Sequence, residues 1–85
     1  MILVTGGTGL VGSHLLLKVA QQNQSVRALY RKGANLERVK TVFSYYSENS
    51  KSLYETIEWA EADLNDLPKL TLAFKDITHV FHCAA

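Results

Sequence analysis

The chain has 85 residues, a formal net charge of +1, and 47% hydrophobic residues. This length allows one domain with a thin core, because small domains bury a smaller share of their surface than large ones. The balanced charge argues against a nucleic-acid-binding surface, which needs a basic stripe. No apolar run approaches the roughly 20 residues of a membrane-spanning helix, and no signal peptide precedes the first strand. We therefore expect a cytoplasmic protein without nucleic-acid or membrane partners.

Strand and helix patterns alternate along the chain. We expect strands at residues 1–5, 25–30, 57–62 and 78–83, and helices at about 10–22, from 36 into the serine-rich stretch 44–52, at 53–55 and at 67–74. Asn35 and Asp66 are the expected caps of the second and last helices. The second helix carries an apolar stripe, which consists of Leu36, Val39, Phe43 and Tyr46. Such alternation predicts an α/β fold with a parallel sheet and crossover helices.

A glycine-rich run, TGGTGLVG at residues 5–12, lies where the first strand ends and the first helix begins. Gly6 or Gly7 would permit a sharp turn. Gly9 would let a pyrophosphate approach the N–H groups at the helix start, and Gly12 would let the helix press against the first strand. This context favours a nucleotide site over the alternative, a turn that merely needs small residues.

The residue after the second strand is Arg31, and no acidic residue precedes Glu37. In dinucleotide-binding folds an acidic residue at this point accepts from the ribose 2′-hydroxyl, whereas an arginine pairs with a 2′-phosphate. Arg38 follows one turn into the next helix. Residues 1–36 carry four basic residues and no acidic one, which also suggests an anionic ligand. These features favour NADP over NAD, unless Arg31, Lys32 and Arg38 are ordinary surface charges.

Four stretches in order carry a family resemblance: TGGTGLVG at 5–12, VRALYR at 26–31, ADL at 62–64 and VFHCAA at 80–85. Together they resemble the N-terminal segment of an extended short-chain dehydrogenase/reductase. This group includes nucleotide-sugar epimerases and dehydratases and dihydroflavonol-reductase-like enzymes. The resemblance implies a Rossmann-type doubly wound parallel sheet, of which residues 1–85 would be the N-terminal half, a fragment of a longer protein with about four parallel strands.

The resemblance also implies a set of cofactor contacts. The pyrophosphate and adenosine ribose would lie on Gly6, Thr8, Gly9, Leu10, Val11 and Gly12. The 2′-phosphate would be held by Arg31 and Arg38, the adenine would meet Asp63 and Leu64, and the path toward the nicotinamide would follow Cys83, Ala84 and Ala85.

Three residues near these positions have simpler interpretations. Asp63, followed by Asn65 and Asp66, could serve turn and cap chemistry. His82 is better explained as a packing histidine than as a catalytic one, because no acid or second histidine is placed to orient it. Cys83 is more commonly a small buried hydrophobe than a reactive thiol. As the single cysteine it excludes an internal disulfide, and we expect no metal site.

The enzymes that this chain resembles use a tyrosine as general acid/base, with a lysine four residues later. The fourth residues after the four tyrosines are Ala34, Asn49, Ser50 and Glu58, so no such pair is present. We assign no catalytic residue and expect that pair downstream, in an NADP-dependent oxidoreductase that reduces a small carbonyl substrate. The alternatives are a nucleotide-sugar epimerase/dehydratase that uses NAD, and a non-catalytic dinucleotide-binding module. An apolar strand at 79–83 could also pair with a second copy.

Overall fold

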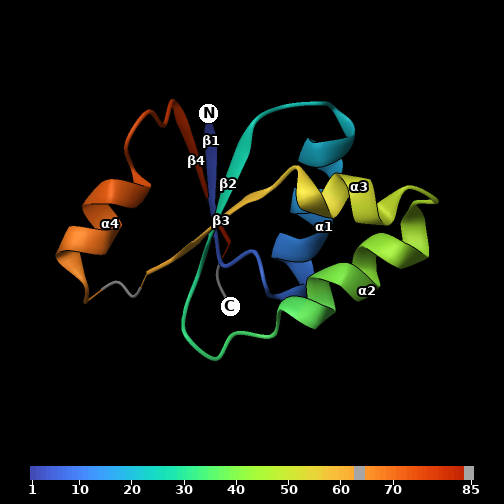
Figure 1. Cartoon of the computed structure of the whole chain (residues 1–85), viewed down its shortest axis with the longest axis horizontal. Coiled ribbons are helices and arrows are strands. Elements are labelled where there is room, and N and C mark those ends of the chain that lie inside the picture. Colours follow the sequence, from blue (N-terminus) through green and yellow to red (C-terminus); the bar gives the residue numbers. More distant parts are fainter. Residues whose placement is uncertain (63–64, 84–85) are drawn as a thin grey trace.

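A parallel sheet of four strands forms the centre of the computed structural model, which describes residues 1–62 and 65–83 (Figure 1). The strands are β1 (Ile2–Thr5), β2 (Val26–Tyr30), β3 (Glu58–Glu61) and β4 (His79–His82), in the order β3-β2-β1-β4. Ile2 pairs with Val26 on one side and with His79 on the other. The central position of β1 explains its apolar sequence, because Leu3 and Val4 are buried on opposite faces of the sheet.

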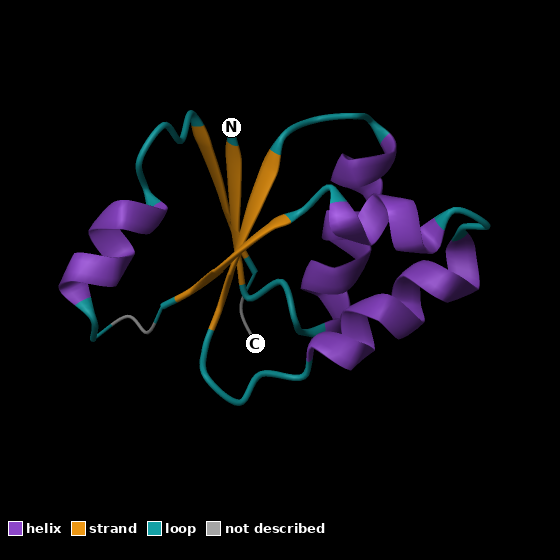
Figure 2. Ribbon diagram, viewed as in Figure 1, coloured by secondary structure: helices purple, strands orange, loops and turns teal. Residues whose placement is uncertain are grey.

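The helices lie on both faces of the sheet, as Figure 2 shows. They are α1 (Leu10–Gln21), α2 (Leu36–Tyr46), α3 (Ser50–Glu55) and α4 (Leu67–Ala73). The first three cover one face and α4 covers the other (Figure 1). Right-handed crossovers require this division. The chain moves outward from β1 to β2 and β3 with its helices on one face, and the return from β3 to β4 places α4 on the opposite face.

The larger core lies between the sheet and helices α1 to α3. Its buried members come from β1, β2, these helices and the turn between α3 and β3, and include Val4, Leu16, Val26, Ala28, Val39, Phe43, Leu53 and Ile57. The smaller core lies under α4 and consists of Leu3, Leu29, Ala62 and Ala73. Both cores therefore form on a sheet whose side chains alternate between the two faces.

The structure confirms the α/β fold class and the parallel sheet with crossover helices. Asn35 and Asp66 accept from the backbone N–H groups of Arg38 and Lys69, as expected of N-caps. Two details differ from expectation. Helix α3 begins at Ser50, and the apolar stripe of α2 leaves the core after Phe43, because Tyr46 is 64% exposed and Val42 is buried instead.

Strand β4 is the least buried of the four, since all of its residues are exposed. Val80 and Phe81 are 47% and 44% exposed and lie on opposite faces of the sheet. The other edge strand, β3, carries Glu58 and Glu61 at its two ends. The two edges thus differ in chemistry, and β4 is the apolar one. Among the described residues no helix combines the length and apolar character needed to cross a membrane.

Candidate functional site

The glycine loop between β1 and α1 lies at the carboxyl end of the sheet, beside the loop that follows β2 (Figure 1). Gly6 has a φ of +69°, and a Cβ atom there would lie 1.9 Å from the carbonyl oxygen of Cys83. The Cys83 N–H in turn donates to the Thr5 carbonyl at 3.0 Å. Of the two candidates for the sharp turn, Gly6 is the one that needs a left-handed conformation. Its lack of a side chain lets the loop and the end of β4 touch.

Gly12 is needed for a different contact. A Cβ atom on Gly12 would lie 2.2 Å from the Gly6 carbonyl oxygen and 2.7 Å from the Gly7 Cα atom. The first turn of α1 therefore presses against the glycine loop itself, and the close approach expected between Gly12 and the first strand is made with the loop instead. Backbone atoms cannot move aside as a flexible side chain can, so a larger residue at position 12 would displace the loop.

The buried side chain of Ser13 holds the glycine loop in place, a role that was not predicted from the sequence. Its side chain is fully buried, and its Oγ lies 2.6 Å from the Gly9 carbonyl oxygen and 3.1 Å from the Gly7 carbonyl oxygen. A buried hydroxyl needs such partners, because an unpaired one would be costly. The signal in the sequence was a small polar residue directly after Gly12, on the side of α1 that packs inward.

The start of α1 presents free backbone donors. Gly9 occupies the N-cap position with extended backbone (φ −75°, ψ 172°), and no side chain of the described residues caps the helix there. The N–H groups of Leu10, Val11 and Gly12 have no carbonyl one turn earlier to bond, and the helix dipole makes this end positive. The side chains of Leu10 and Val11 are 64% and 72% exposed. This arrangement can receive an anion.

Gly9 itself is not required by the fold. A Cβ atom there would have one neighbour within 4 Å, the Gly6 carbonyl oxygen at 3.5 Å, which is an ordinary van der Waals contact. Its φ is one that any residue adopts. Thr8, the neighbouring residue assigned to the cofactor, is half-buried. The absence of a side chain at position 9 therefore leaves open space in front of the donors of α1.

The two arginines expected at the 2′-phosphate lie near the start of α2. Arg31 directly follows β2, and its carbonyl accepts from the Ala34 N–H at 3.0 Å, which closes the turn. The Arg38 N–H is held by the Asn35 side chain at 3.2 Å. Both arginine side chains are exposed, and neither forms an ion pair within residues 1–62 and 65–83.

A groove of about 610 Å³ runs along the length of α2, beside the first turns of α1. It is lined by residues of both helices: Leu10, His14, Asn35, Glu37, Arg38, Thr41, Val42, Tyr45 and Tyr46. The groove joins the glycine loop, through Leu10, to Arg38, whereas Arg31 is not part of its lining. His14 donates from Nδ1 to the Leu10 carbonyl at 2.8 Å, and its ring lies 5.3 Å from that of Tyr46.

The structure describes some of the remaining residues that were considered for the site from the sequence, and not others. Cys83 is half-buried at the end of β4 and touches the glycine loop. His82 is exposed rather than in the core, and its Nδ1 is hydrogen-bonded to the buried Thr5 hydroxyl, so it links β4 to β1. Asp63, Leu64, Ala84 and Ala85 lie outside the described residues. No metal-binding cluster of His, Cys, Asp or Glu occurs in the part of the chain that the structure describes.

Comparisons with known proteins agree with this geometry. The chain is 34% identical over 83 residues to a dihydroflavonol 4-reductase of Hordeum vulgare, which covers 98% of this chain and 22% of the relative. It is 36% identical over 84 residues to the protein BRI1-5 ENHANCED 1 of Arabidopsis thaliana, again covering 22% of the relative. The crystal structure of an isoflavone reductase superposes with a TM-score of 0.74 at 30% identity, over 99% of this chain and 26% of that one.

The chain thus spans about a fifth of the length of the curated relatives it matches. The family model that matches residues 2–85 is that of NAD-dependent epimerases and dehydratases. It covers the glycine loop, the loop after β2 and strand β4 in a single match. The resemblance stated from the sequence is confirmed: the chain belongs to the NAD-dependent epimerase/dehydratase family.

Proposed function

We propose that residues 1–85 form the cofactor-binding half of an NADP-dependent oxidoreductase that reduces a carbonyl substrate, within a longer protein. The family membership supports a dinucleotide site, and the likeness to a dihydroflavonol 4-reductase supports a reductase. The bound dinucleotide would supply the hydride. The residues described above would bind and orient it, whereas the tyrosine and lysine that handle the proton would lie beyond residue 85.

The pyrophosphate is proposed to lie at the start of α1. The N–H groups of Leu10 and Val11 would bond to its oxygens, and the positive end of the helix dipole would favour its charge. The open space at Gly9 supports this assignment, because nothing inside the protein requires a glycine there. Ser13 would keep the loop in shape by holding the Gly7 and Gly9 carbonyls away from the anion.

The preference for NADP depends on Arg31, the single observation that carries this proposal. Arg31 follows the carboxyl end of β2, where the ribose 2′ position lies in dinucleotide-binding folds, and its charge has no acidic partner among the described residues. A guanidinium can hold a phosphate through two parallel hydrogen bonds. Arg38, which lines the groove, would provide a second positive charge.

The test is a titration of the intact protein with NADPH and with NADH. We expect NADPH to bind at least about tenfold more tightly, and Arg31→Asp to reverse or abolish that preference, since charge-assisted hydrogen bonds of this kind are each worth about 1.5–3 kcal/mol. Lys32→Ala is the matched control, because Lys32 is the adjacent exposed cation. Equal affinities for both nucleotides, unchanged in Arg31→Asp, would contradict NADP selection.

The family description also supports a second candidate, an NAD-dependent epimerase or dehydratase that acts on a nucleotide sugar. The same titration separates the two, because an NAD enzyme would bind NADH at least as tightly as NADPH. An intact protein that binds dinucleotide but carries no tyrosine with a lysine four residues later would instead be a non-catalytic binding module.

The open edge of β4 supports a further property of the segment when it is expressed alone. Its residues are exposed, and Val80 and Phe81 offer apolar contacts on both faces of the sheet. Edges of this kind pair with other strands unless they are covered. We expect residues 1–85 in isolation to associate in a concentration-dependent manner, and a strictly monomeric segment in sedimentation experiments would contradict this.

A further inference from the structure

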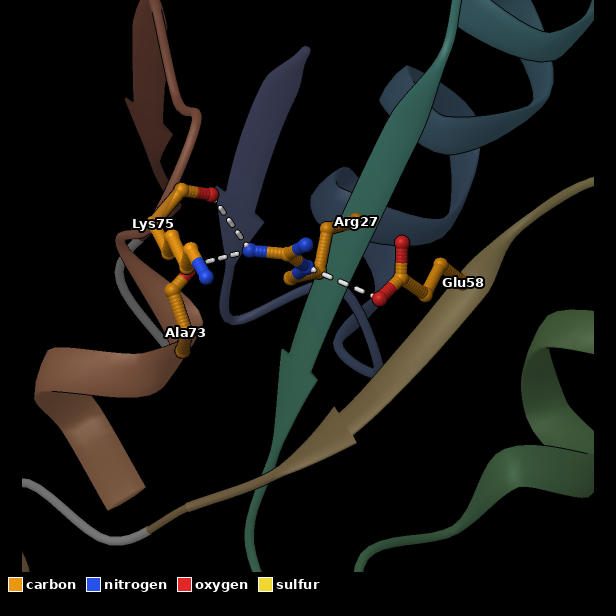
Figure 3. Close-up of polar contacts among 4 residues, drawn as sticks. All are labelled: Arg27, Glu58, Ala73 and Lys75. Carbon is orange, nitrogen blue, oxygen red and sulfur yellow. Dashed lines mark hydrogen bonds and ion pairs between the residues drawn. The ribbon is translucent and has the colours of Figure 1, made fainter. Parts of the chain in front are cut away.

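Two hydrogen bonds between side chains join neighbouring strands in the described part of the sheet. One is made by Arg27 of β2, whose side chain is 13% exposed and whose Nε donates to Glu58 of β3 at 3.2 Å. The Nη1 of the same arginine donates to the carbonyl oxygens of Ala73 and Lys75, at and just after the end of α4 (Figure 3). Arg27 and Glu58 lie near the amino ends of their strands. The other bond lies at the carboxyl end of the sheet, between β1 and β4.

This second bond is between the Thr5 hydroxyl and the His82 ring. Thr5 ends β1, His82 ends β4, and the two residues are paired directly across the strands. The Thr5 Oγ1 and the His82 Nδ1 lie 2.5 Å apart. Thr5 is 9% exposed, and its hydroxyl has no other hydrogen-bond partner within residues 1–62 and 65–83. Loss of the ring nitrogen would therefore leave a buried hydroxyl unpaired, which is costly.

Two backbone contacts join the end of β4 to the same point of the chain. The Cys83 N–H donates to the Thr5 carbonyl at 3.0 Å, and a Cβ atom on Gly6 would lie 1.9 Å from the Cys83 carbonyl oxygen. The end of β4 thus touches both the last residue of β1 and the first glycine of the loop. Of these contacts, the bond from His82 is the one that a side-chain substitution can remove.

The glycine loop connects Thr5 to the start of α1 through further close contacts. The Gly9 N–H, at the N-cap of α1, donates to the Gly6 carbonyl at 3.2 Å. A Cβ atom on Gly12, in the first turn of the helix, would lie 2.2 Å from that same oxygen. Because these backbone atoms already touch, a shift at Thr5 would be passed on to the helix start rather than absorbed by the loop.

We propose that His82 is a positioning residue for the pyrophosphate site. It holds the Thr5 hydroxyl, and through Thr5 and Gly6 it keeps the backbone donors of α1 at a fixed place relative to the end of β4. Ser13 holds the loop carbonyls from the side of α1, and His82 holds the loop from the side of β4. This inference rests on the proposed function and adds to it a role for a histidine that the sequence suggested only for packing.

The test is calorimetric titration of NADPH and of NADH into the intact protein and into variants of the pair. Thr5→Val has a similar shape but lacks the hydroxyl, and His82→Phe keeps a ring but lacks the nitrogen. We expect each variant to bind NADPH about three- to tenfold more weakly, the range that one neutral hydrogen bond allows. Binding of NADH should weaken by the same factor, because both nucleotides contain the pyrophosphate, so the ratio that Arg31 sets should stay constant.

The double variant separates the hydrogen bond from other effects of the two substitutions. If the bond itself positions the loop, Thr5→Val/His82→Phe should bind NADPH no more weakly than the weaker of the two single variants. Losses that multiply would show that the two residues act independently and would overturn the inference. A direct contact between the His82 ring and the nucleotide would also be exposed, because Thr5→Val leaves the ring in place.

His82→Asn is the conservative variant that should restore binding. Its amide places an oxygen or a nitrogen at the same number of bonds from Cα as the ring Nδ1, and either atom can pair with the Thr5 hydroxyl. We expect its affinity for NADPH to lie within about twofold of that of the unmutated protein. A variant that is merely tolerated in packing, such as His82→Phe, should not show this recovery.

Thr78→Val is the matched control. The Thr78 hydroxyl donates to the Met1 carbonyl at 3.3 Å, so it joins the chain segments at the amino ends of the same two strands, far from the glycine loop. Its removal should leave the affinity for both nucleotides unchanged. An equal loss in Thr78→Val would show that pairing of β4 with β1 in general, and not the bond to His82, supports binding, and would overturn the inference.

The outcomes for the inference and for the proposed function can be told apart. Unchanged NADPH affinity in Thr5→Val, or in His82→Phe, would refute positioning by His82 and leave dinucleotide binding intact. Should His82→Phe fail to fold, Thr5→Val and His82→Asn decide in the same way, the first by a loss and the second by its absence. Failure of the unmutated protein to bind either nucleotide would refute the proposed function and this inference together.

Discussion

The two faces of the sheet are held together by different means. The face under α1, α2 and α3 has a large apolar core, with Leu16, Val39 and Phe43 fully buried. The face under α4 has four buried residues, of which two are alanines, and a largely buried arginine, Arg27, that bonds to the helix end. Apolar packing is non-directional, whereas the hydrogen bonds of Arg27 fix α4 at a defined place.

The apolar core under α1, α2 and α3 therefore mainly stabilises the fold, whereas the hydrogen bonds of Arg27 mainly position α4. The first face should supply most of the free energy of folding, because apolar burial is the dominant favourable contribution. The second face should contribute less and open more easily, as regions with few apolar contacts do. Substitutions of the same kind on the two faces should therefore differ in their effects on the free energy of unfolding and on local opening.

The largest contrast is expected between two phenylalanines. Phe43 is fully buried in the core between α2 and the sheet, and Phe43→Ala should lower the free energy of unfolding by about 3–5 kcal/mol through lost contacts and a cavity. Phe74, at the end of α4, is 43% exposed, and Phe74→Ala should cost less than about 1 kcal/mol. Denaturant unfolding measures the free energy of unfolding of both variants. Equal decreases would show that the two faces do not differ in their contribution to stability.

A smaller effect is expected at Arg27. Arg27→Met should lower the free energy of unfolding by about 1–3 kcal/mol, since it removes hydrogen bonds from a largely buried charge. Hydrogen exchange should increase first in α4, at amides such as that of Leu70. Glu58→Gln should cost less than about 1 kcal/mol, because exposed ion pairs contribute little. Equal protection of α4 in both variants would show that Arg27 does not hold the helix.

The smallest effects concern the two helix caps. Asn35 caps α2 and Asp66 caps α4, each by accepting from the backbone N–H three residues later. Replacement of either by alanine should cost about 1 kcal/mol. Asn35→Ala should lower the midpoint of global unfolding, whereas Asp66→Ala should mainly increase local exchange in α4. If Asp66→Ala alone lowered the global stability, the face under α4 would be the one that stabilises the fold.

Much of the fold could be predicted from local patterns. The apolar strands, the two caps and the glycine loop mark the elements to within a few residues, because each depends on neighbours in the sequence. Tyr46 shows where this reasoning ends. Its spacing from Phe43 continues the helical stripe, but the core ends before it, and only the three-dimensional arrangement of α1 and α2 decides that.

The site was also predictable only in part, because its glycine motif is local in the sequence whereas several of its contacts are not. The need for glycine at Gly6 and Gly12 follows from the motif, although the contact partner of Gly12 is the loop rather than the strand. Arg27 was counted among the basic residues that suggest an anionic ligand, but its partners are Glu58 and the carbonyls of Ala73 and Lys75. Those partners lie 31 to 48 residues away in the sequence, so no local pattern could reveal them.

Calorimetric titration of NADPH into the intact protein and its Gly9→Ala variant tests whether a pyrophosphate binds at the start of α1. Because a Cβ at Gly9 would meet only an ordinary contact inside the protein, the variant should lose less than about 1 kcal/mol of stability. Its affinity for NADPH should nevertheless fall at least about tenfold, since the added methyl group would stand between the anion and the helix donors. Unchanged affinity in a stable Gly9→Ala variant would contradict a pyrophosphate at this helix.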